Sequence, residues 1–109
     1  MLATNNERVD EAILQAASVD YLDLWFITHV VEDVLGEAQE EPLIRKTALD
    51  AIERLIRAER LRVGDLRPPG EFEAWTLDPT TALERIDREL AALNRPLGVG
   101  DVAWFEVPE

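Results

Sequence analysis

The sequence predicts a single α+β domain over residues 1–109, with three helices first, a small antiparallel sheet, and an extra helix inserted between its later strands. Three observations predict this fold class. Apolar residues recur at helical spacing in four segments, they alternate with polar residues in three shorter ones, and proline or glycine separates most segments. The 109 residues are 47% hydrophobic, which suffices for one core.

The first two helices are predicted in the N-terminal third of the chain. Thr4 begins a stretch with capping-box spacing, with the two asparagines that follow as alternative caps, and the helical spacing continues to about Ala17. Asp23 is the expected cap of the second helix, and Gly36 is the residue expected to end it. Because residues 24–35 are apolar around much of the helix circumference, we expect this helix to be central.

The third helix and the strands follow. Pro42 is expected at the first position of the helix, since proline is favoured there. Alternating residues then predict strands near 61–66, 72–75 and 102–107. The pair Pro69-Gly70 suits the centre of a type II turn between the first two of these strands.

A fourth helix is predicted from the pair Asp78-Pro79, which combines a cap with a first-turn proline. Its apolar stripe consists of Leu83, Ile86, Leu90 and Leu93. Because this stripe must be buried against another element, we expect the helix to cover part of the sheet.

The charge of the chain is strongly acidic. It carries 23 acids and 11 bases, for a formal charge of -12. The net charge is -9 within residues 1–41, +3 within 42–69 and -6 within 70–109. Such a surface repels nucleic acid and anionic lipid and attracts basic proteins. We therefore expect a basic protein partner, although solubility alone would also account for the charge.

Features missing from the sequence disfavour several classes of function. There is no cysteine, so a disulfide, a thiolate metal site and a thiol nucleophile are excluded. The first residues lack the basic and apolar regions of a signal peptide, and no apolar run approaches the length of a membrane span. We expect a cytoplasmic protein with no membrane association and no cofactor.

The candidate catalytic residues do not form a recognisable set. His29 has two carboxylates one turn further along its helix, which makes a poor zinc site, and we expect it to be partly buried and hydrogen-bonded. Ser18, the only serine, has no base near it in the sequence. The pair Gly98 and Gly100 precedes a strand, whereas a dinucleotide-binding fingerprint follows one. The sequence therefore predicts neither an enzyme nor a metal site.

One stretch of the chain has the apolar spacing of a known superfamily. It comprises Ile13-Leu14-Gln15-Ala16, the helix from Leu24, and the helix-to-strand step through Leu55-x-x-Ala58-Glu59-x-Leu61-x-Val63-Gly64-Asp65. Over about residues 7–66 and the last strand, the chain resembles the winged helix-turn-helix superfamily. It departs from that pattern because the fourth helix lies between the strands of the wing. The ending, with its Gly-Asp-x-x-Trp strand, also resembles that of small bacterial proteins.

The resemblance implies a DNA-binding transcriptional regulator as an alternative function. In that superfamily the third helix enters the major groove and the wing contacts phosphate. The residues that would contact DNA are Lys46, Arg54, Arg57, Arg60 and Arg67. Acids stand four residues from several of these bases, so a helix surface of weak ion pairs is the other interpretation. Winged helices often dimerise through terminal helices, so the resemblance allows a homodimer formed through Trp25, Ile27 or Val31 if these are exposed.

A protein-binding surface is predicted on the outer face of the sheet. Alternation along two strands allows Trp75 and Trp104 to lie away from the core, and the neighbouring acids are Glu71, Glu73 and Glu106. Tryptophan anchors many interfaces, and the acids would steer a basic partner. The alternative is that the fourth helix covers both tryptophans. We therefore predict a non-catalytic, acidic protein-interaction module, such as an inhibitor or immunity-type protein for a basic partner.

Overall fold

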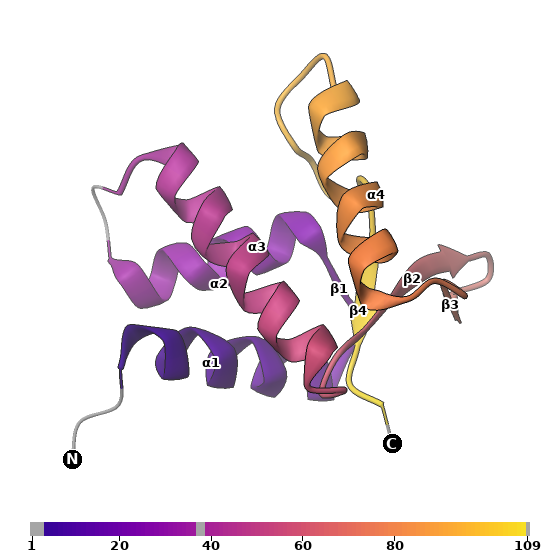
Figure 1. The fold of residues 1–109 in the computed structure, drawn as a ribbon, viewed down its shortest axis with the longest axis horizontal. Helices are drawn as coiled ribbons and strands as arrows, with labels where there is room; N and C mark the ends of the chain where they lie inside the picture. The colour runs from indigo at the N-terminus through magenta and orange to yellow at the C-terminus, as the bar shows by residue number, and fades with distance from the viewer. Residues whose placement is uncertain (1–3, 37–38, 109) are drawn as a thin grey trace.

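The computed structural model describes residues 4–36 and 39–108, which form four helices and one four-stranded antiparallel sheet (Figure 1). The elements in chain order are α1 (Asn5–Val19), β1 (Leu22–Asp23), α2 (Leu24–Leu35), α3 (Glu41–Arg57), β2 (Arg62–Arg67), β3 (Glu71–Ala74), α4 (Pro79–Ala92) and β4 (Trp104–Glu106). The predicted α+β class, with its fourth helix between the later strands, is confirmed.

Local side-chain hydrogen bonds begin three of the helices at the predicted residues. The side chains of Thr4, Asp23 and Asp78 accept a backbone N–H of the first turn in α1, α2 and α4, at 3.1, 2.9 and 3.0 Å. These bonds satisfy donors that a helix start leaves without a partner. Helix α1 continues to Val19, two residues beyond the predicted end.

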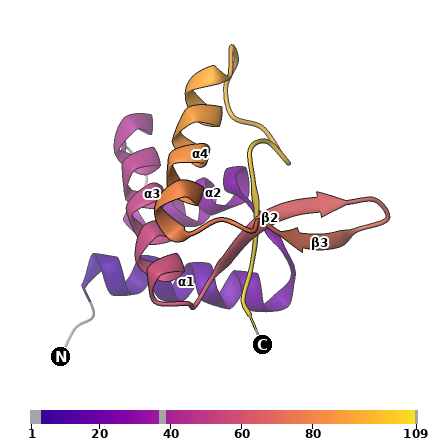
Figure 2. The same cartoon turned by 45° about the vertical axis from the view of Figure 1, so that its right-hand side comes forward.

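The strand order is β1-β4-β2-β3, so the last strand in the sequence lies inside the sheet. Figure 2 shows the β2–β3 hairpin projecting from the helices. The hairpin turn differs from the predicted one. Its central residues are Pro68 and Pro69, joined by a cis peptide bond, and the N–H of Gly70 donates to the carbonyl of Arg67 at 2.6 Å. The prediction that Pro69 and Gly70 form the centre of a type II turn is therefore wrong.

The core lies between the helices and one face of the sheet. Phe105 of β4 is opposite Leu22 of β1 on one side and Val63 of β2 on the other, and all three are buried. Apolar stripes of all four helices complete the core. Burying each large aliphatic or aromatic side chain contributes about 1.5–3 kcal/mol. The opposite face of the sheet is left for other contacts.

Candidate functional site

The structure places the two predicted interface tryptophans on opposite faces of the sheet. Gly64 of β2 is directly opposite both Ala74 of β3 and Trp104 of β4. Residues that are opposite one another in an antiparallel sheet point to the same face. Trp104 therefore shares the outer face with Ala74, and Trp75, one residue further along, points to the face that packs on the helices.

Trp75 is covered by α4, which is the alternative that the sequence left open. Its ring packs against the core, and the Cζ atom of Arg85 in α4 lies 3.8 Å from the ring centroid. This stacked geometry is a cation–π contact. The indole nitrogen of Trp75 is buried, with no hydrogen-bond partner among the described residues. The sequence also allowed Trp75 to lie away from the core, and the structure does not place it there.

The three predicted interface acids do not gather at one place. Glu73 lies 3.4 Å from Arg67 across the hairpin, and Glu71 is exposed near the turn. Glu106 pairs with Arg62 on the outer face. Because Glu71 and Glu73 alternate with Phe72 and Ala74, they lie on the face opposite to Glu106 and Trp104.

Trp104 instead lines a groove with a cavity volume of about 420 Å³. We call this the tryptophan groove, and its main apolar residues are Val19, Tyr21, Trp25, Phe26, Val99 and Trp104. They come from the end of α1, the start of α2, the segments beside β1, the loop before β4, and β4 itself. Sequence reasoning identified only Trp104 as a surface residue of this set. The position of Val19 at the end of α1 was the one signal that a side chain there would be exposed.

Two carboxylates hold the backbone around the tryptophan groove. Asp23 is 3% exposed, and besides capping α2 it accepts a hydrogen bond from the N–H of Gly100. Asp101 accepts two bonds from Arg95, at 2.5 and 2.9 Å, and one from the N–H of Gly98 at 2.8 Å. These contacts fix the loop that presents Val99 beside Trp104.

The Arg95 guanidinium and the Gly98 N–H lower the pKa of Asp101 to about 2, because both hydrogen bonds favour the carboxylate. At neutral pH the charged carboxylate of Asp101 therefore holds the loop through these hydrogen bonds.

An aromatic contact lies beside the tryptophan groove on the outer face of the sheet. The rings of Tyr21 and Phe72 stack there with centroids 5.5 Å apart.

Four of the five cations predicted for DNA binding face carboxylates. The pairs are Lys46 with Asp50 at 2.9 Å, Arg54 with Asp10 at 2.7 Å, Arg57 with Glu53 at 2.9 Å, and Arg67 with Glu73 at 3.4 Å. Arg60 is exposed. The hydrogen bonds to Asp10 raise the pKa of Arg54, despite partial burial. These five side chains therefore do not form one uncompensated basic ridge.

The remaining candidates are also placed by the structure. His29 is exposed, with its ring edge-on to Trp25 at 4.1 Å, so the expectation of a partly buried histidine is wrong. Within residues 4–36 and 39–108, histidine and carboxylate side chains do not gather in groups of three that could hold a metal ion. Ile27 and Val31 are fully buried and cannot form a dimer surface.

None of the helices in the described part of the chain has the length and apolar character needed to cross a membrane. No protein-family description, curated protein or solved structure matches the chain at a significant level.

Proposed function

We propose that the chain is a non-catalytic protein-interaction module that binds a basic protein through the tryptophan groove, as an inhibitor or immunity-type protein would. The observation that carries the proposal is the gathering of exposed apolar side chains around Trp104. Val19, Val99 and Phe26 have exposed fractions of 84%, 69% and 44%. Apolar side chains that cluster at a surface are typical of binding sites, and tryptophan is enriched among the residues that dominate binding energy.

The expectation of a basic partner is supported by the charge of the segments that form the groove. Residues 5–35, which supply Val19, Trp25 and Phe26, contain seven acids and one arginine. Their field would accelerate association with a basic protein, and added salt would weaken this effect. The apolar side chains would then provide the short-range contacts.

We also propose that the fold is a divergent winged helix whose wing is lengthened by β3 and α4. The support is topological, because β1 lies between α1 and α2, and β4 lies between β1 and β2 in the sheet. A DNA-binding regulator is therefore the alternative function. It is the weaker candidate because duplex binding depends on cations that neutralise phosphates, and most of the candidate cations have carboxylate partners.

Two double variants test the proposed surface. Phe26→Ser with Val99→Ser removes exposed apolar side chains of the tryptophan groove, and Leu43→Ser with Leu77→Ser removes exposed leucines outside it. Capture from nuclease-treated native lysate, quantified by mass spectrometry, should enrich one basic protein with the wild type and the leucine variant. The groove variant should lose that protein.

A partner retained by the groove variant would contradict the proposed surface. Sedimentation tests whether the chain associates with itself. If the wild type self-associates and the groove variant does not, the occupant of the groove is a second copy, and the proposal of a basic partner is overturned.

A duplex DNA titration at low salt tests the alternative function of a DNA-binding regulator. We expect no binding, whereas binding with a steep salt dependence would place the regulator first.

A further inference from the structure

Helices α3 and α4 touch at one end and diverge toward the other. The side chain of Arg57, near the end of α3, donates to the hydroxyl of Thr80 in the first turn of α4 at 3.2 Å. From this contact the helices separate toward the start of α3 and the end of α4 (Figure 1). The space between them has a cavity volume of about 520 Å³. We call it the helix groove, and its walls are α3 from Glu41 to Glu53 and α4 from Leu83 to Asp87.

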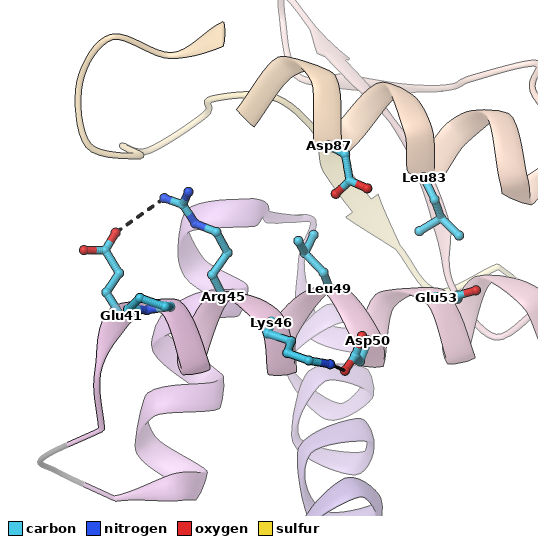
Figure 3. Close-up of a pocket in the computed structure, with 9 residues that line it drawn as sticks. Glu41, Arg45, Lys46, Leu49, Asp50, Glu53, Leu83 and Asp87 are labelled. Atoms are coloured by element: carbon cyan, nitrogen blue, oxygen red, sulfur yellow. Dashed lines mark hydrogen bonds and ion pairs between the residues drawn. The ribbon is translucent and has the colours of Figure 1, made fainter. Parts of the chain in front are cut away.

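The floor of the helix groove is apolar. Leu83 points from α4 toward α3, and Leu49 points back toward α4 (Figure 3). Both side chains are only partly buried and pack against the core on one side, so their other side remains open to the groove. An apolar residue placed between them would bury this surface.

The rim of the helix groove is negatively charged. Four carboxylates and two bases line it. Three of the carboxylates face bases of α3, as the pairs Glu41 with Arg45, Asp50 with Lys46, and Glu53 with Arg57. Asp87 is exposed and points into the groove, and it has no ion-pair partner within the described ranges 4–36 and 39–108 (Figure 3). An incoming cation can therefore pair with Asp87 without displacing an internal partner.

We propose that the helix groove binds an amphipathic basic helix of a partner protein, with apolar residues over Leu49 and Leu83 and a lysine or arginine beside Asp87. The two walls are helices and offer no free strand edge, so an extended peptide would gain no main-chain pairing there. The wall from Glu41 to Glu53 is about 18 Å long at 1.5 Å per residue, which matches about three turns of a docked helix.

This surface is separate from the tryptophan groove, because no residue lines both. The inference therefore does not depend on the proposed function. The two surfaces can belong to one basic partner or to two, and each has its own test.

The probe is a synthetic, fluorescently labelled peptide of lysine and leucine with helical spacing, titrated by anisotropy against the full chain. Two reference peptides accompany it: one with the same composition in scrambled order, and one with glutamate in place of lysine. The amphipathic basic peptide should bind, and its affinity should fall less steeply with salt concentration than charge attraction alone would give. The scrambled and acidic peptides should bind at least about tenfold more weakly.

A matched pair of α4 variants locates the binding. Asp87→Lys reverses the carboxylate in the groove, and Glu84→Lys reverses an exposed carboxylate of the same helix that does not line it. Both side chains are exposed, so neither change disturbs the core. We expect Asp87→Lys to weaken binding about tenfold and Glu84→Lys to weaken it less than about threefold.

Equal effects of the two variants, or equal binding of the scrambled peptide, would overturn the inference, since only net charge would then matter. Binding that is lost in the Phe26→Ser, Val99→Ser variant would also overturn it, because the peptide would occupy the tryptophan groove. Retention of binding in that variant, together with sensitivity to Asp87→Lys, supports the helix groove whatever the outcome for the proposed function.

Discussion

Gly64 lies where the backbones of β2 and β3 approach closely. A Cβ atom added there would lie 2.8 Å from the Cα of Ala74 and closer still to the carbonyl oxygen of Glu73. Both are backbone atoms, so the strands themselves would have to separate. A glycine inside a strand often marks such a close approach.

We therefore predict that Gly64→Ala lowers the free energy of unfolding by more than about 2 kcal/mol, because the clash forces a backbone shift. Gly98→Ala is the control, since its Cβ would meet side-chain atoms at 3.4 and 3.8 Å and should change stability by less than about 0.5 kcal/mol. Urea denaturation of both variants measures the difference. Similar midpoints for the two would show that the strands can separate freely at Gly64.

Asp101 gives the stability a defined dependence on pH. Its pKa falls from 3.8 to about 2 in the folded chain, so the unfolded state binds this proton more readily. A lowered carboxyl pKa contributes stability that is present above pH 3.8 and is lost as the pH falls through about 2.

Asp101→Asn should therefore be less stable than the wild type at neutral pH, and the difference should shrink as the pH falls toward 2. Urea denaturation across this range tests it, and the carbon NMR titration of the Asp101 carboxyl gives the pKa directly. In Arg95→Gln that pKa should rise toward its ordinary value. If the difference in unfolding free energy between wild type and Asp101→Asn stays constant with pH, the hydrogen bonds of the charged Asp101 carboxylate are not its source.

Among the elements, the starts of α1, α2 and α4 were predictable because each depends on residues within one turn. The side chain of Asp23 and the N–H of Phe26 are three positions apart, and the same spacing serves Asp78 and Thr81. A local sequence therefore contains both partners of each bond.

We predict that Asp23→Ala destabilises the chain by about 2 kcal/mol, the upper end of the range for a helix cap, and by more than Asp78→Ala. Asp23 is buried and also accepts from Gly100, so its loss leaves a second donor without a partner, whereas Asp78 is exposed and caps only α4. Thermal and urea unfolding of the two variants measure the difference. Equal losses would show that the bond to Gly100 contributes nothing.

The faces of the strands were less predictable than the helix starts. Alternation shows that Trp75 and Phe72 point to opposite sides, but only the pairing of Gly64 with Ala74 and Trp104 decides which side faces the helices. That register joins strands distant in sequence. The same limit applies to the tryptophan groove, because Val19, Phe26 and Val99 come together only through the tertiary fold.

At the scale of the whole molecule, the charge of -12 affects stability as well as binding. Like charges on a compact chain repel one another more than they do in the expanded unfolded state. The ion pairs seen here are mostly exposed, and such pairs each contribute about 0–1 kcal/mol.

We therefore predict that the melting temperature rises when sodium chloride is increased from low concentration to about 0.15 M, where the screening length is about 8 Å. Calorimetry or circular dichroism at neutral pH measures the change. A matched sucrose series controls for general solvent effects. A melting temperature that falls with salt would mean that the ion pairs outweigh the repulsion.

The position of β4 has a consequence for how the chain is made. Its residues, Trp104–Glu106, separate β1 from β2, yet they are synthesised after all the other described helices and strands. A nascent polypeptide emerging from the ribosome can form its helices and the β2–β3 hairpin, but β1 has no neighbour until these three residues have emerged. Products cut short before Trp104 would therefore display an unpaired strand edge and an open core, which are features that chaperones and proteases recognise.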